Sequence, residues 1–286
     1  MLTLTMDEWA RFRDALKKID QKAADEFRDA IFKLSGKYKG VGLGQIPRED
    51  LINYAFALAT KYGEASAAVS AEMYDAVAAL QGMDLLPAVP ASTASYSEVA
   101  KMVDGILKKS VNEEMLIGGL TRLVKMAGTD TTLMNAHRDR PRATGTGTGR
   151  HKHSGARVAW VPSGDTCAFC IALAARGWQS QTEWAANNHS EHIHSNCDCT
   201  YMVRFNDDLT YEGYDPEKYR EMYDAGIDVP FENEDDSHPD HESVPWQKIN
   251  GMRRANYAQN KDKINAQHRE AYALRKQAIE AGEIEE

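Results

Sequence analysis

The chain of 286 residues contains no apolar run that approaches the roughly 18 residues needed to cross a membrane. Its first residues, Met1 to Glu8, include neither the basic cluster nor the apolar stretch of a secretory signal. These absences argue against a membrane partner and predict a protein that folds in a cytoplasm. Because a cytoplasm is reducing, thiols and metal sites are favoured there over disulfides.

Motifs of common enzyme classes are also missing. The glycine-rich run at 144–149 has no strand before it and no apolar helix after it, as a dinucleotide loop requires, and no Gly-Lys-Ser/Thr closes it as in a P-loop. No nucleophile elbow or comparable context singles out a catalytic triad. The sequence therefore predicts a protein that is not an enzyme.

The first half of the chain has strong helical periodicity. Apolar residues recur there at spacings of three and four, which places them on one face of a helix. The predicted helices are one at 9–34 capped by Thr5 with Glu8, one from Pro47 to Leu80, one from Ser95 through Val124 capped by Ser95 with Glu98, and a short one from Asp130 to Arg138. The predicted fold class is mainly α, with an elongated N-terminal helical bundle, a small α+β Cys/His module of the zinc type and a C-terminal helix.

Composition changes along the chain suggest five segments. They are a helical domain at 1–138, a basic Gly/Thr linker at 139–156, a Cys/His strand–helix–strand module at 157–206, an acidic segment at 207–245 and a C-terminal helix at 246–286. Within the module, strands are expected at 157–161 and 200–205, with a helix ending near Arg176 before Gly177. A further helix is expected near 216–225.

Charge is unevenly distributed around the formal net value of −9. Residues 206–242 contain 14 acids against Lys218 and Arg220, whereas residues 138–157 contain six lysines or arginines against Asp139 alone. An acidic segment and a basic linker are therefore interpreted separately.

All four cysteines lie between residues 167 and 199. Cys167-x-x-Cys170 is a two-thiolate half-site, and its position at the start of a helix favours the thiolate form. His194-x-x-Cys197-x-Cys199 would close the site, because alternate residues of a strand point to the same face. The pattern predicts a structural Zn²⁺ held by the four cysteines, with His194 either beside the ligands or replacing one cysteine.

Several alternatives to a zinc scaffold stay open at this point. Cross-paired disulfides are one, and a thiol oxidoreductase using Cys167-x-x-Cys170 is another, although the sheet expected of a thioredoxin-like fold does not follow. A zinc-ribbon nucleic-acid-binding protein is a third alternative. It would require a basic surface, and residues 157–205 contain few basic residues. A zinc deaminase is disfavoured because its Cys-x-x-Cys follows the His-x-Glu, whereas here it precedes His189-Ser190-Glu191.

The module resembles a known family. Arg157-Val-Ala-Trp-Val-Pro162, then Asp165-Thr-Cys-Ala-Phe-Cys170, Gly177 and His194-x-x-Cys197-x-Cys199 together resemble the Mu F-like minor head proteins of the phage head morphogenesis family, in the version found in phages and prophages of actinobacteria. The resemblance covers about residues 128–205. One departure is Ser195, where many members have proline.

This resemblance implies a structural role in the virion. The expected protein is a minor capsid component of the head interior or portal vertex, assembled in the host cytoplasm, whose partners are the phage portal protein, the major capsid protein or both. The resemblance also suggests that the basic linker contacts packaged DNA. The alternative is that the linker is a solvated tether. The candidate DNA contacts are Arg138, Arg140, Arg142, Arg150 and Lys152.

Overall fold

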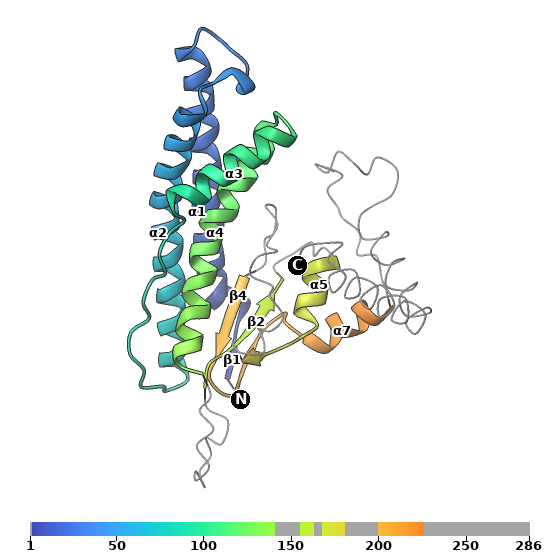
Figure 1. The fold of residues 1–286 in the computed structure, drawn as a ribbon. Coiled ribbons are helices and arrows are strands. Elements are labelled where there is room, and N and C mark those ends of the chain that lie inside the picture. The colour runs from blue at the N-terminus through green and yellow to red at the C-terminus, as the bar shows by residue number, and fades with distance from the viewer. Residues whose placement is uncertain (1, 141–154, 163–167, 181–199, 226–286) are drawn as a thin grey trace, which may run out of the picture. The chain divides into compact units, whose positions relative to one another are not determined.

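The computed structural model describes residues 2–140, 155–162, 168–180 and 200–225 (Figure 1). The chain divides into two compact units, of which the first comprises residues 1–164 and 176–216 and the second residues 165–175 and 217–286. The described part is mainly helical with a few short strands, which confirms the predicted fold class at that level.

Helix α1 (Met6–Lys37) begins at the predicted capping box. The Thr5 hydroxyl accepts from the Glu8 backbone N–H at 3.3 Å, and the Glu8 carboxylate accepts from the Thr5 backbone N–H at 2.8 Å. These bonds satisfy donors that a helix N-terminus leaves without intrahelical partners. After a turn that contains the short 3-10 helix η1 (Leu43–Gln45), α2 (Arg48–Leu80) begins directly behind Pro47, as predicted.

The next two helices differ from the prediction. Instead of one helix from Ser95 through Val124 and a separate one at 130–138, the structure has α3 (Tyr96–Lys109) and α4 (Glu113–Arg138). Ser110 is extended, and the Asn112 side chain caps α4 by accepting from the Met115 backbone N–H at 3.1 Å. The apolar stripe indicated a helical face correctly, but it did not show that a cap interrupts it.

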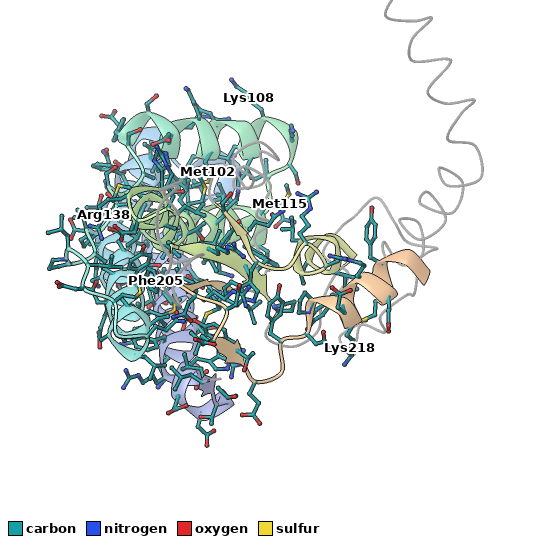
Figure 2. All side chains as sticks on the ribbon, turned by 90° about the horizontal axis from the view of Figure 1, so that it is seen from below. Met102, Lys108, Met115, Arg138, Phe205 and Lys218 are labelled. Carbon is teal, nitrogen blue, oxygen red and sulfur yellow. The ribbon has the colours of Figure 1, made fainter. Side chains whose placement is uncertain are left out.

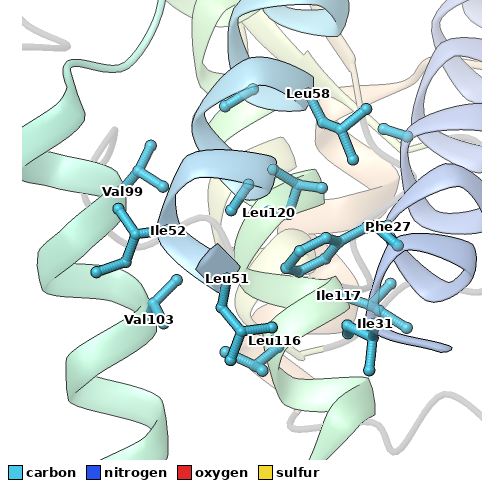
Figure 3. Packing of buried hydrophobic residues seen from close by; sticks show 14 of the residues in the cluster. Phe27, Ile31, Leu51, Ile52, Leu58, Val99, Val103, Leu116, Ile117 and Leu120 are labelled. Carbon is cyan, nitrogen blue, oxygen red and sulfur yellow. The ribbon is translucent and has the colours of Figure 1, made fainter. Parts of the chain in front are cut away.

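The hydrophobic core of the first unit lies between these helices (Figure 3). Phe27 from α1, Leu51 from α2 and Leu120 from α4 are each fully buried. Val99 and Val103 bring α3 onto the same cluster. Burial of aliphatic and aromatic surface, at about 25 cal/mol per Å², is the main force that holds the helices together.

Small residues allow α2 and α4 to approach closely. A Cβ atom placed on Gly128 of α4 would lie 2.6 Å from Ser66 Oγ and 2.7 Å from Ser70 Oγ, both on α2. Gly63 of α2 is similarly confined, since its Cβ would lie 2.9 Å from Thr93 Cγ2. The glycine in the middle of α4 is therefore required by packing.

Two small sheets complete the first unit. Strand β2 (Arg157–Val161) pairs antiparallel with β4 (Thr200–Arg204) and with β3 (Gln179–Ser180), in the order β3-β2-β4. Strand β1 (Leu2–Leu4) pairs in parallel with β5 (Leu209–Tyr211). The strands expected at 157–161 and 200–205 are therefore present.

Direct contacts join β4 to α2 within this unit. The Phe205 backbone N–H donates to Gln81 Oε1 at 2.7 Å, and the Gln81 amide also contacts Asn206. The rings of Phe205 and Tyr74 pack edge to face with centroids 5.2 Å apart. The strands therefore share a core with the helices that precede them in the chain.

In the second unit the described elements are α5 (Ala168–Ala174) and α7 (Pro216–Ala225), the latter at the predicted position. Arg220 Nη2 donates to the carbonyl oxygen of Ala175 at 3.3 Å. Most of the basic linker, most of the acidic segment and the predicted C-terminal helix lie outside the described residues. Among the helices that are described, none combines the length and apolar character required to cross a membrane.

The packing around Gly128 predicts a difference between two glycines. Gly128→Ala should lower the free energy of unfolding by about 1–3 kcal/mol, because the new methyl group overlaps the hydroxyls of Ser66 and Ser70. Gly105→Ala in α3, where nothing lies within 4 Å, should instead raise it by about 0.5–1 kcal/mol. Urea unfolding followed by circular dichroism measures both, and equal effects would contradict the close approach.

Candidate metal site and its surroundings

Of the predicted zinc ligands, the structure describes Cys170 alone. It lies in α5 and is 1% exposed. Cys167, His194, Cys197 and Cys199 lie outside the described residues, so the predicted ligand set stays a prediction. Within the described ranges, no group of three or more His, Cys, Asp or Glu residues could hold a metal ion.

The register of β2 and β4 places the two residues that flank the cysteine-containing segment at one end of a strand pair. Val161, the last residue of β2, is paired with Thr200, the first residue of β4. Cys167 follows Val161 by six residues, and Cys199 directly precedes Thr200. The segment 162–199, which contains all four cysteines, therefore begins and ends at the same end of this pair.

Aromatic residues form the core around these strands. Trp160 is 2% exposed, and its ring packs edge to face against Tyr201 with centroids 4.4 Å apart. Trp178 packs against Tyr211 and Tyr214 at 5.4 and 5.8 Å. Trp160 and Trp178 are therefore part of the core around these strands.

One arginine is held inside this aromatic group. The Arg204 guanidinium lies over the Trp178 ring at 4.8 Å and pairs with Asp207 at 2.7 Å. Burial lowers the pKa of Arg204, and the nearby carboxylate of Asp207 opposes that shift. The arginine thus has a structural role beside the sheet.

Arg138, a predicted DNA contact, is labelled in Figure 2 and makes several hydrogen bonds within the protein. Its guanidinium binds the Asp139 carboxylate in a bidentate pair, with Nε to Oδ1 at 2.9 Å and Nη2 to Oδ2 at 2.7 Å. It also donates to the carbonyl oxygens of Leu86 at 2.8 Å and Pro87 at 2.9 Å. These bonds fasten the end of α4 to the segment that connects α2 with α3.

Asp139 joins this pair to α2 and to the start of β2. Its Oδ2 accepts from the Tyr74 hydroxyl at 2.9 Å, and its carbonyl oxygen accepts from the Ala156 backbone N–H at 2.9 Å. Burial and the Asp139 charge raise the pKa of Tyr74. The two ends of residues 141–154 are consequently held together. Arg140 contacts His137, and Arg142, Arg150 and Lys152 lie outside the described residues.

Buried polar residues of α4 hold the segment at 83–95, which we call the strap. The Asn135 amide accepts from the Val89 N–H and donates to the Val89 carbonyl oxygen, both at 2.9 Å. Thr131 Oγ1 accepts from the Ala91 N–H at 2.9 Å. These residues were not among those predicted from the sequence, although polar side chains on an otherwise apolar helical face were the available signal.

Asp130 is a partly buried carboxyl group on the same helix. Burial is the larger cause that raises its pKa, and the neighbouring negative charge of Glu98 is the smaller one. The pKa of Glu98 itself is lowered by its hydrogen bonds to Ser95. The raised pKa means that the folded state binds a proton at Asp130 more readily than the unfolded chain.

These features define a class of protein: mainly helical, with long helices that share a core with small sheets, and with a cysteine-containing segment inserted between strands. Comparison with known families then identifies it. The VG15 protein family matches residues 3–226, so the chain belongs to this family of phage or viral proteins. No curated protein and no solved structure matches the chain.

The Arg138 contacts predict a specific loss of stability. Arg138→Met keeps much of the side-chain stem but removes the bonds to Asp139, Leu86 and Pro87, and should lower the free energy of unfolding by about 2–3 kcal/mol. Arg140→Met, at an exposed position two residues later, should change it by less than about 0.5 kcal/mol. Equal losses in urea unfolding would contradict a structural role for Arg138.

The raised pKa of Asp130 predicts a pH dependence of stability. Since the folded state binds this proton more tightly, its contribution to stability should decrease as pH rises through the range above the usual aspartate pKa. Asp130→Asn should therefore be more stable than the unaltered chain near neutral pH, and the gap should narrow in acid. Urea unfolding at a series of pH values tests this, and a gap that widens in acid would contradict it.

Proposed function

We propose that the chain is a minor head protein located at the portal vertex, with a structural and non-catalytic role in head assembly. The match to the VG15 family carries this proposal, because the matched residues extend from α1 to α7 and the family consists of phage or viral proteins. The resemblance of residues 128–205 to Mu F-like minor head proteins supports the finer assignment. In this proposal the helices provide surfaces that dock on the portal or the inner capsid.

The proposed function includes a structural zinc ion. The residues that would hold it are Cys167, Cys170, Cys197 and Cys199, with His194 beside them or in place of one cysteine. The pairing of Val161 with Thr200 and the burial of Cys170 fit this donor set. The thiolates would hold the ion, and its binding would contribute folding energy to the segment that contains the cysteines.

Contact with packaged DNA is a second, separate candidate for the basic segment. The hydrogen bond between Asp139 and Ala156 favours this candidate, because it joins the two residues that flank the basic segment on the first unit. Arg140, Arg142, Arg150 and Lys152 would supply the charges. Binding of this kind should weaken steeply as salt concentration rises.

Metal analysis tests the zinc assignment. Protein purified in reductant should contain about one zinc per chain, as expected for one site with four ligands. Cys167→Ser and Cys170→Ser should each lose the metal while α1 to α4 keep their helical circular dichroism signal. A metal-free preparation with the same unfolding transition as the zinc-loaded chain would show that no structural zinc is needed.

Association with the portal tests the head-protein assignment. The full chain, co-expressed with the portal protein of the same phage, should co-purify with portal rings through size exclusion. An unrelated helical protein of similar size and charge is the control. Elution of the full chain entirely apart from the rings, with both proteins folded, would contradict portal docking.

A further inference from the structure

One end of the helical layer exposes apolar side chains where three segments meet. Phe32 of α1 is 80% exposed, Val111 of the α3–α4 turn is 59% exposed and Met115 of α4 is 37% exposed. Arg28 of α1, one turn before Phe32, reaches Glu114 of α4 with Nη2 to Oε1 at 3.2 Å.

The α1–α2 turn reaches the same place. A Cβ atom placed on Gly44 would lie 3.3 Å from Val111 Cγ1, so η1 lies against the α3–α4 turn. Ile31 and Leu34 of α1 are buried in the core, at 4% and 2% exposure, whereas Phe32 between them is turned to solvent. Core packing therefore does not account for the phenylalanine at position 32.

Lysines border this apolar group. The residues concerned are Lys33, Lys39, Lys108 and Lys109, which are exposed. Their side chains make no hydrogen bond or ion pair with any residue that the structure describes, and the Lys108 side chain projects away from α3 (Figure 2).

Neighbouring cations are already paired, as Lys37 is with Asp50 at 2.9 Å and Arg48 with Asp104 at 3.2 Å. Asp29 and Glu49 are the acids of segments 28–50 and 104–115 without such a pair among the described residues. Arg28 is shared between Glu113 at 3.9 Å and Glu114 at 3.2 Å. The seven lysines and arginines of these two segments therefore exceed their six acids by one, a net charge of +1.

We propose that this lysine-rimmed end, formed by Phe32, Val111 and Met115 with the four lysines, docks an acidic segment of a partner protein that inserts apolar side chains between them. An apolar centre with an exposed aromatic residue and a charged rim is the usual anatomy of a protein–protein interface. Complementary charge steers the partner and fixes its orientation. The inference rests on the proposed function, which makes the portal or capsid protein the partner.

The apolar centre favours a protein over duplex DNA as the occupant. Duplex DNA is bound mainly through its phosphates, and paired, stacked bases leave little apolar surface to cover Phe32, Val111 and Met115. An acidic protein segment matches both the lysines and the apolar centre.

The test measures binding of the full chain to purified portal rings by surface plasmon resonance. Phe32→Ser should weaken the dissociation constant about tenfold or more, as expected for an aromatic residue at the centre of an interface. Lys108→Gln with Lys109→Gln should weaken it several-fold and reduce its dependence on salt concentration. Thermal midpoints of all variants should match the unaltered chain, since these side chains are exposed.

Matched controls lie elsewhere on the same unit. Leu86→Ser in the strap removes a side chain that is 72% exposed, and Lys18→Gln with Lys22→Gln removes two exposed charges from α1. Neither should change binding. Failure of the unaltered chain to bind contradicts the proposed function together with this inference. If the Phe32→Ser variant binds the portal rings as well as the unaltered chain does, the docking surface is overturned and the proposed function is not. The same holds if the double lysine variant loses binding to duplex DNA but keeps its binding to the portal.

Discussion

The pair of Arg138 and Asp139 at the end of α4 connects the parts of the first unit. The arginine holds the strap through the carbonyl oxygens of Leu86 and Pro87. The aspartate binds the Tyr74 hydroxyl on α2 and, through its carbonyl oxygen, the backbone N–H of Ala156 just before β2. Helices, strap and sheet therefore depend on one partly buried ion pair, whose loss would leave several polar groups without partners.

Sequence alone predicted the elements whose signals are local. Capping boxes at Thr5 and Ser95 place the starts of α1 and α3, and β-prone residues at 157–161 place β2. The break before α4 was missed because an apolar stripe shows which face is buried and not where a cap such as Asn112 interrupts the helix. The role of Arg138 could not be predicted either, because its carbonyl partners lie about fifty residues earlier and are brought close only by folding.

The candidate zinc site was predicted from cysteine spacing, and the structure adds the geometry of its flanks. Because Val161 pairs with Thr200, the insertion that contains all four cysteines begins and ends at one end of the β2–β4 pair. An insertion of that kind gains stability from a cross-link, which a metal ion supplies in a reducing compartment. The VG15 family match shows a phage or viral protein, and the scaffold role in the phage head remains our proposal.

The central claim is that the chain is a component of the head. Quantitative mass spectrometry of purified heads of the phage that encodes it tests this most directly, with the portal protein as the internal standard. The account predicts that the chain is present in every preparation at a few copies per portal ring and remains after high-salt washing. Its absence from purified heads, while it is abundant in the infected cell, would contradict the account.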